Sequence, residues 1–364
     1  MSPAARIGIF SRALAEILDH ALIAPGKTLR WVLIANPRAG GFVISSRWAR
    51  HAEALGRIQA LARGNPRRSG APGLGSSGLI LTDRFGRPKD LASVLRADFF
   101  PSEFSDEGPF YLILTAGGDG TSRDVLQALY EMPRMQNQGA VLRLPLGTGN
   151  DGADAWELDR ALELLLYPSK LELSRAVRLT TARGRGPFYA FNILSLGLDA
   201  FVTHMTNKIK SFFPGDLYKL WVDLAALFYD RFYRPGPMGV CAFDDEGNPV
   251  KLFRESLLLL AMGVTGGRTY GSHRRILPDE RNVCALKQMP LFRKWALKKS
   301  IDAGSHALAP EALLFSAHRI ELRGDHRILA QMDGETISLT PEDFPAVLEL
   351  TEPALPILKP GTSI

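Results

Sequence analysis

The clearest pattern of apolar and polar positions lies between residues 110 and 130. An unbroken apolar run from Phe110 to Leu114 predicts a buried strand. The sequence GGDGT comes next over residues 117–121, after which apolar Val125 and Leu129 return at helical spacing. Together these positions predict a strand, a glycine turn and a helix.

A second strand with a similar ending lies further along the chain. Val141 to Leu146 is again apolar and runs directly into GTGND over residues 147–151. Strands of one parallel sheet present their carboxyl ends at the same edge, where ligands bind. Strands and helices alternate over residues 28–170, starting with an apolar strand over 29–35. This alternation predicts a parallel α/β domain with both glycine loops at one edge.

After residue 174 the pattern changes to short strands joined by turns. Two apolar strands on either side of the turn DDEGN, over residues 238–253, form a predicted hairpin. Similar short strands continue to about residue 350. An all-β second domain is the economical interpretation, with one helical insertion over residues 200–233.

These patterns divide the chain into four parts. They are an amphipathic N-terminal helix over residues 1–27, an α/β domain over 28–172, a β-rich domain over 173–350, and a C-terminal tail over 351–364, for which a return to the first domain is one expectation. The apolar face of the N-terminal helix can pack against the protein's own body or dock on a membrane surface. The sequence leaves both interpretations open.

Composition limits the classes of protein that fit. The chain has 364 residues, of which 46% are hydrophobic and 23% charged, enough for two globular domains with full cores. Two cysteines, Cys241 and Cys284, exclude a disulfide framework and suit a reducing compartment. The longest apolar run, Leu257 to Val264, is too short to span a membrane, and no secretory leader pattern is recognised. We therefore expect a cytoplasmic protein.

The net charge of +6 favours contact with anions such as nucleotides, nucleic acids or a membrane surface. The basic residues are spread along the chain, and no nucleic-acid-binding motif is present, so no nucleic-acid partner is expected. The insertion over 200–233 mixes basic and large apolar residues, as membrane-contacting surfaces do. A peripheral position at the membrane is the expectation, and the oligomeric state is left open, a homodimer included.

The glycine loops carry the candidate chemistry. Glycine lets the backbone approach a bulky anion, and the N–H groups at the start of the next helix bind phosphate oxygens. A carboxylate such as Asp119 repels phosphate unless a divalent cation bridges the two, or unless it accepts a proton or a hydroxyl. The loop lacks the Lys-Ser/Thr ending of a P-loop. A Mg-nucleotide is therefore the expected ligand, and the plain alternative is a structural turn with Asp119 as a capping residue.

The pair GGDGT and PLGTGND resembles the catalytic domain of diacylglycerol kinases and their relatives, the sphingosine and ceramide kinases, which share a superfamily with NAD kinases. The resemblance covers about residues 28 to 358. It implies an α/β nucleotide-binding domain with a parallel sheet, an all-β, sandwich-like lipid-substrate domain, and an interdomain cleft. The implied activity is transfer of the γ-phosphate of ATP to a lipid hydroxyl with Mg²⁺.

The resemblance also implies roles for individual residues. The DGE sequence at residues 333–335 matches the family's D-G-E motif, which makes Asp333 the general base acting on the substrate hydroxyl and gives Glu335 a part in ordering the metal or nucleotide. Without that context the sequence is simply a hairpin turn. The implied nucleotide-binding residues are Asn36, Gly40, Gly41, Gly117, Gly118, Gly120, Thr121, Gly147, Thr148, Gly149 and Asn150; the metal ligands are Asp119, Asp124 and Asp151; and the catalytic residues are Asp333, Glu335 and Asp119.

Some positions depart from the family pattern. Arg123 and Asp124 stand where the family commonly has Asn and Glu, and the stretch that begins with Gly152 and Ala153 lacks the aromatic residue and the arginine often found after GTGND. These changes do not alter Asp119. We therefore interpret the chain as an active kinase for a lipid alcohol of the diacylglycerol or sphingoid type. Two alternatives stay open: an NAD kinase or other soluble-metabolite kinase, and a relative that binds lipid or nucleotide without catalysis.

Overall fold

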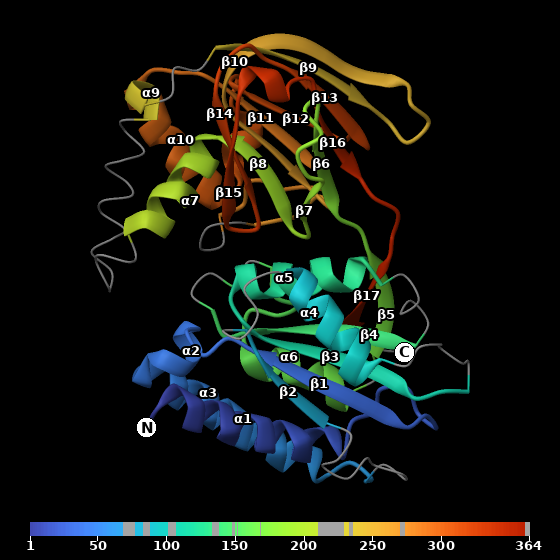
Figure 1. The fold of residues 1–364 in the computed structure, drawn as a ribbon. Helices are drawn as coiled ribbons and strands as arrows, with labels where there is room; N and C mark the ends of the chain where they lie inside the picture. The colour runs from blue at the N-terminus through green and yellow to red at the C-terminus, as the bar shows by residue number, and fades with distance from the viewer. Residues whose placement is uncertain are drawn as a thin grey trace. The chain divides into compact units, whose positions relative to one another are not determined.

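The computed structural model describes residues 1–67, 77–82, 88–100, 107–132, 138–147, 150, 152–167, 169–209, 229–232, 236–269 and 274–360. The chain divides into two compact units. In Figure 1, where the colour follows the residue number, the red C-terminal strand β17 (Leu355–Pro360) belongs with the blue-to-green first unit. Unit 1 contains Met1–Ser174 together with Pro353–Ile364, and unit 2 contains Arg175–Glu352. We describe each unit by itself.

Unit 1 is built on a six-stranded sheet with the order β2-β1-β3-β4-β17-β5. Its strands are β1 (Leu29–Ala35), β2 (Ser77–Leu81), β3 (Phe110–Gly117), β4 (Gly139–Pro145), β5 (Ser169–Ser174) and β17 (Leu355–Pro360). All neighbours run parallel except β17 and β5. Every residue of β3 and β4 is buried, as expected for central strands of a parallel sheet. The predicted parallel α/β fold is confirmed.

Helices cover both faces of this sheet (Figure 1). They are α1 (Pro3–Leu18), α2 (Gly40–Val43), α3 (Ser45–Ala62) and α6 (Leu158–Leu166) on one face, and α4 (Pro88–Val94), continued by a π-helical turn (Leu95–Phe99), with α5 (Asp119–Tyr130) on the other. The apolar residues of α1, among them Phe10 and Leu14, lie in the core of unit 1. Buried Arg6 donates hydrogen bonds to the carbonyls of Phe42 (2.7 Å) and Val43 (3.0 Å). The apolar face of α1 therefore packs against the protein's own body.

Unit 2 is an antiparallel β structure of eleven strands, which confirms the predicted all-β domain. The order β15-β14-β8-β10-β9-β13-β16-β6-β7 is extended by β11, which pairs with β10 and β12. The strands are β6 (Val177–Thr181), β7 (Phe188–Ala190), β8 (Ile193–Gly197), β9 (Pro237–Phe243), β10 (Pro249–Gly263), β11 (Val283–Lys287), β12 (Ala312–Phe315), β13 (Arg319–Arg323), β14 (Ile328–Met332), β15 (Glu335–Leu339) and β16 (Ala346–Leu350).

The long strand β10 joins the two halves of this sheet. Its first part pairs with β9, and its second part pairs with β8 and β11. Buried residues from both halves, such as Val240 and Leu348 in one and Leu196 and Ala330 in the other, share one hydrophobic cluster. The sheet therefore folds over on itself into a sandwich-like arrangement.

Helices cover another face of unit 2. They are α7 (Leu198–Ile209), α9 (Tyr229–Phe232) and α10 (Leu291–Ala303), with short 3₁₀ helices at Ser305–Leu308 and Pro341–Asp343. Phe201 of α7, Tyr229 of α9 and Ile301 of α10 share a core cluster with Leu259. The helices α7 and α9 fall in the predicted insertion, most of whose remainder lies outside the described residues. Helix α10 lies outside that insertion, so the pattern missed it.

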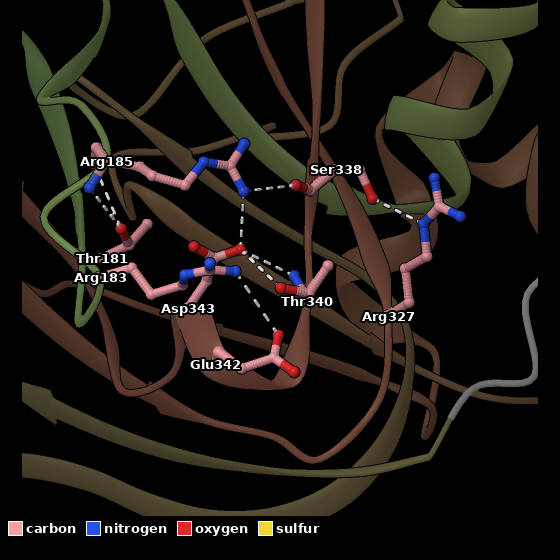
Figure 2. A network of polar contacts seen from close by, with 8 residues as sticks. All are labelled: Thr181, Arg183, Arg185, Arg327, Ser338, Thr340, Glu342 and Asp343. Carbon is pink, nitrogen blue, oxygen red and sulfur yellow. Dashed lines mark hydrogen bonds and ion pairs between the residues drawn. The ribbon is translucent and has the colours of Figure 1, made fainter.

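A polar network fastens the turn between β6 and β7 to the segment after β15 (Figure 2). The Arg185 guanidinium donates to Oδ2 of Asp343 (2.8 Å) and to the carbonyl of Ser338 (3.2 Å), and Thr340 donates to the same Asp343 oxygen from its backbone N (2.9 Å) and hydroxyl (3.1 Å). Asp343 is fully buried. Burial by itself raises the pKa of this carboxyl, but the Thr340 hydrogen bonds and the Arg185 charge hold the pKa below its usual value.

Candidate functional site

The strand register of unit 1 brings three loops to one edge of the sheet. Ala35 pairs with Ala116, and Gly117 pairs with Pro145, so β1, β3 and β4 end at the same level. Beyond these ends, the Asn36 side-chain amide donates to the Thr121 hydroxyl (3.1 Å). The structure thus joins Asn36 and Thr121, which are 85 residues apart in the sequence, at the edge predicted for ligand binding.

The two glycine loops touch one another closely. A Cβ added at Gly147 would lie 2.3 Å from the Cα of Gly118, which no pair of carbon atoms tolerates. The Gly147 N–H donates to Oδ1 of Asn150 (2.7 Å), whose backbone is left-handed with φ of 61°. Gly41 N donates to the carbonyl of Leu146 (2.8 Å). Glycine at position 147 is therefore required by contact between loops.

Asp119 is the first residue of α5, directly after Gly118 at the N-cap position. The first N–H groups of a helix have no helical acceptor and carry partial positive charge, which favours anions. Oδ1 of Asp119 accepts a hydrogen bond from Gly152 N (2.8 Å). Gly152 is one of the positions that departs from the family pattern, and here its backbone orients the Asp119 carboxylate.

The structure does not bring Asp124 to the same helix face as Asp119. Five helical residues correspond to a rotation of about 140° beyond one turn. The Asp124 carboxylate instead accepts from Nε (3.2 Å) and Nη2 (2.6 Å) of Arg123. Within the part of the chain that the structure describes, no three His, Cys, Asp or Glu residues form a metal-binding group. Three predicted site residues, Thr148, Gly149 and Asp151, lie outside that part.

Two residues of α3 that sequence reasoning did not select lie against the same loops. Nη1 of Arg47 donates to the carbonyl of Gly147 (3.1 Å), and a Cβ added at Gly41 would lie 3.0 Å from Nε2 of His51. Arg47 thus supplies a positive charge that the glycine loops lack. Arg47 and His51 could have been found from the sequence, because a spacing of four residues places them on one face of a helix. That helix follows the predicted nucleotide-binding residues Gly40 and Gly41.

The predicted DGE turn lies between β14 and β15 of unit 2. Asp333 (φ of 46°) and Gly334 (φ of 95°) are both left-handed, and Glu335 begins β15 as an exposed residue. The Asp333 carboxylate accepts three backbone hydrogen bonds from residues 191–193, at the start of β8: from Phe191 N to Oδ2, and from Asn192 N (3.1 Å) and Ile193 N (3.2 Å) to Oδ1. These bonds fix the position of the carboxylate.

A buried polar group supports this turn. Gln331 accepts from Gly334 N (3.0 Å) and donates to both Ser195 Oγ and Asp199 Oδ2 (3.0 Å each). Ser195 also donates to Asp199, and the three side chains are at most 5% exposed. Ser195 lies in β8 and Asp199 in the first turn of α7, directly after the residues whose backbone binds Asp333. Residues 191–199 therefore hold the turn from two sides, through their backbone and through these side chains.

Comparison with known proteins shows which proteins this arrangement is similar to. Residues 81–181, which contain both glycine loops, match the diacylglycerol kinase catalytic domain. A diacylglycerol kinase of Bacillus subtilis (strain 168) is 24% identical over 242 residues, which are 65% of this chain and 74% of that protein. A Yersinia enterocolitica protein named "Probable lipid kinase YegS-like" is 26% identical over 235 residues, 62% of this chain and 72% of that protein.

The chain is thus similar to the diacylglycerol kinase catalytic-domain family. The crystal structure of a diacylglycerol kinase from Bacillus anthracis strain Sterne shares the fold, with a TM-score of 0.53 and 12% identity over 92% of this chain and 98% of the other. This similarity to kinases indicates a phosphotransferase, and a kinase uses ATP as co-substrate. The matched range ends at residue 181, so the DGE turn lies beyond it. Among the described helices of this chain, none is long and apolar enough to cross a membrane.

The His51 ring gives this protein a predicted pH dependence of its stability. Burial, together with the charges of Arg50 and Arg47, lowers the pKa of His51 from 6.5 to about 4. Between these values the unfolded chain binds a proton that the folded protein does not. The free energy of unfolding is therefore expected to fall as the pH drops from 6.5 to 4, by about 2 kcal/mol after allowing for partial solvent exposure of the ring.

Urea unfolding at several pH values across this range measures the effect. His51→Gln is the control, because glutamine does not titrate, and its unfolding free energy is expected to depend less on pH. If the unfolding free energy changed equally with pH in both proteins, His51 would not be the cause of the pH dependence.

Proposed function

We propose that this protein transfers the γ-phosphate of ATP to the hydroxyl of a lipid alcohol, of the diacylglycerol or sphingoid class, with the help of Mg²⁺. The observation that carries the proposal is the edge of the unit 1 sheet, where the loops of Asn36, Asp119 and Gly147 come together. The lipid acceptor is supported by the names of the relatives, a diacylglycerol kinase and a lipid kinase-like protein.

The edge of the sheet has the chemistry that ATP phosphates need. Backbone N–H groups at the start of α5 and in the glycine loops bind phosphate oxygens, and the Arg47 charge lies beside Gly147. Glycines 40, 41, 117, 118, 120, 147 and 149 allow the backbone to approach, with Thr121, Thr148 and Asn150 as further hydrogen-bonding residues.

Asp119 would hold Mg²⁺, because an oriented carboxylate next to phosphates fits a hard cation. Asp151 is a second proposed ligand, and Asp124 a third in spite of its contact with Arg123. Bound Mg²⁺ neutralises phosphate charge during transfer. The chain's own residues position the nucleotide, and Gly152 keeps the Asp119 carboxylate aimed.

The DGE turn of unit 2 is the proposed acceptor site. Asp333 takes the proton of the lipid hydroxyl, and Glu335 helps to order the metal or nucleotide. A general base must lie within hydrogen-bond reach of the proton that it removes. The three N–H groups that hold Asp333 fix its carboxylate in position for that role.

A lipid acceptor also requires contact with a membrane surface, which we include in the proposal. In unit 2, Phe292 on α10 is 72% exposed and Leu308 is 89% exposed, and α10 also carries exposed Arg293 and Lys299. Exposed large apolar and basic side chains on one helix are typical of membrane-surface contact. Flotation with vesicles that contain or lack anionic lipid tests this part, and absence of binding to both would contradict it.

The experiment for the proposed function traces the labelled γ-phosphate of ATP into lipid. Mixed micelles of diacylglycerol, sphingosine and ceramide are the acceptors, a parallel reaction contains NAD, and Asp119→Ala is the control. We expect label in a lipid extract with the wild-type protein and none with the variant. Label in NAD alone would establish the soluble-metabolite alternative, and ATP binding without any transfer would favour a binding protein.

A further inference from the structure

A buried ion pair ties the loop after β4 to that strand. The side chain of Arg143, in β4, is 6% exposed, and that of Asp154 is fully buried. Nε (3.2 Å) and Nη2 (2.7 Å) of Arg143 donate to Oδ1 of Asp154, and the Arg143 backbone N donates to Oδ2 (2.7 Å). Taking two charges out of water is costly, and apolar side chains of similar volume often stabilise a fold as well or better. The pair therefore needs an explanation other than stability.

The strand pattern places Arg143 on the face of the sheet that α5 covers. Leu142 and Leu144 belong to the core cluster that also contains residues of α3 and α6. Since successive side chains of a strand point to opposite faces, Arg143 points to the other face, where α5 lies (Figure 1). Asp119 is the first residue of α5. The ion pair and the proposed metal ligand are thus on the same face of the unit 1 sheet.

A short stretch of backbone connects the pair with Asp119. Gly152 N donates to Oδ1 of Asp119 (2.8 Å), and Asp154 follows two residues later. The backbone N of Asp154 also donates to the carbonyl of Arg143 (3.3 Å). A Cβ added at Gly152 would lie 3.4 Å from Oδ1 of Asp119 and 3.9 Å from Nη1 of Arg143. The Arg143 guanidinium and the Asp119 carboxylate therefore both lie close to Gly152.

The last strand of unit 1 brings a second cation to the same carboxylate. Nζ of Lys359, in β17, lies 3.9 Å from Oδ1 of Asp154, and β17 lies between β4 and β5 in the sheet. An arginine that donates through two N–H groups fixes the orientation of a carboxylate as well as its distance. Asp154 is therefore held in one position, and the backbone that begins two residues before it is held with it.

Resting on the proposed function, in which Asp119 binds Mg²⁺, we propose that the Arg143–Asp154 pair positions the Asp119 carboxylate for the metal. The pair fixes Asp154 to β4, and Asp154 fixes the backbone at Gly152, whose N–H orients Asp119. Loss of a group that orients a metal ligand typically lowers metal affinity about 10- to 100-fold. Arg143 and Asp154 do not touch the metal in this proposal, so both are positioning residues.

The test measures how much Mg²⁺ strengthens the binding of ATP. The full chain is titrated with ATP by calorimetry, once with Mg²⁺ and once with a chelator and no added metal, and the ratio of the two dissociation constants is the metal effect. Arg143→Lys keeps a positive charge opposite Asp154 but lacks the planar fork of arginine. We expect a ratio above about ten for the wild type and a ratio about tenfold smaller for Arg143→Lys, with ATP affinity in the absence of metal unchanged.

Arg185→Lys is the control for the change from arginine to lysine. It alters the partner of Asp343 in unit 2, which is also a fully buried carboxylate. We expect it to lower the melting temperature and to leave the metal effect as in the wild type.

Should Arg143→Lys not fold, the double variant Arg143→Gln with Asp154→Asn takes its place. It removes both charges of the pair together, so neither is left buried without the other. The same loss of the metal effect is expected.

A wild-type metal effect in the Arg143 variants, with only a lower melting temperature, would overturn the inference. So would a ratio near one in the wild type, or an equal loss of the metal effect in Arg185→Lys, which would assign the loss to general destabilisation. Because ATP binding is measured without phosphoryl transfer, these results are separate from failure of the proposed function. That failure would appear as absence of label in every lipid while the metal effect persists.

Discussion

Replacing Gly147 by alanine is expected to abolish ATP binding and to destabilise the protein by about 3 kcal/mol. The added Cβ would lie 2.3 Å from the Cα of Gly118 and 2.8 Å from Oδ1 of Asn150. Carbon atoms in contact need about 3.5 Å, so the two loops must separate by about 1 Å. The atom that the new Cβ would meet at Gly118 belongs to the backbone, so rotation of a side chain cannot relieve the clash. The added Cβ would also crowd Oδ1 of Asn150, which accepts the hydrogen bond from Gly147 N.

Calorimetric titration with ATP and urea unfolding measure the two effects. Gly152→Ala is the local control, because its Cβ would meet Oδ1 of Asp119 at 3.4 Å and Arg143 at 3.9 Å, which are ordinary contacts. Its N–H bond to Asp119 is kept. Normal ATP affinity in Gly147→Ala would show that nucleotide binds away from these loops.

Replacing Asp333 by asparagine is expected to lower kcat at least about 100-fold and to leave ATP affinity unchanged. Asparagine tolerates the left-handed backbone of position 333, where φ is 46°, so the turn is kept. The amide cannot take the proton of an alcohol. Its NH₂ group must also face one of the N–H donors of residues 191–193, so a loss of about 1–3 kcal/mol in stability accompanies the loss of activity.

Phosphate transfer to lipid, ATP titration and thermal unfolding of the same preparation separate these effects. Glu335→Gln is measured beside it, because this change also removes an acidic group from the turn. Glu335, however, is exposed at the start of β15. Turnover in Asp333→Asn close to that of the wild type would remove Asp333 as the base. Loss of ATP binding in the same variant would give the residue a structural role.

Much of unit 1 could be predicted because its central strands are continuous apolar runs. Strand β3 is buried at every position, and its run from Phe110 to Leu114 is visible in the sequence. Strand β17 could not be predicted in the same way, since Pro356 and Pro360 argue against a strand. In unit 2, the charged pair Arg254 and Glu255 interrupts the apolar pattern, so the predicted hairpin ends at residue 253, whereas strand β10 continues to Gly263.

Helix α10 was missed because its apolar stripe is incomplete. Leu297 and Ile301 are buried, but Lys294 is buried with them and pairs with Asp230 (2.6 Å). The charged position hides the helical period that a sequence pattern requires. The contact between Lys294 and Asp230, which are far apart in the sequence, is visible only in the structure.

Part of the candidate site is visible in short sequence motifs, and part depends on contacts between residues that are far apart in the sequence. The motifs located the glycine loops and the DGE turn, because each is a short segment with its own turn chemistry. The contact of Arg47 with Gly147 spans 100 residues, and no local pattern reports which side of α3 meets the sheet.

The place of β17 between β4 and β5 has a consequence for synthesis of the chain on the ribosome. Strands β1 to β4 emerge first, and β17, which joins β4 to β5, emerges only after all of unit 2. At about 5–20 residues per second, the intervening residues 175–352 take roughly 9 to 36 seconds to translate. During that interval β4 presents an open edge, which is the kind of strand that pairs with other chains. Nascent unit 1 is therefore most exposed to aggregation while unit 2 is being made, and arrival of the last strand ends the exposure.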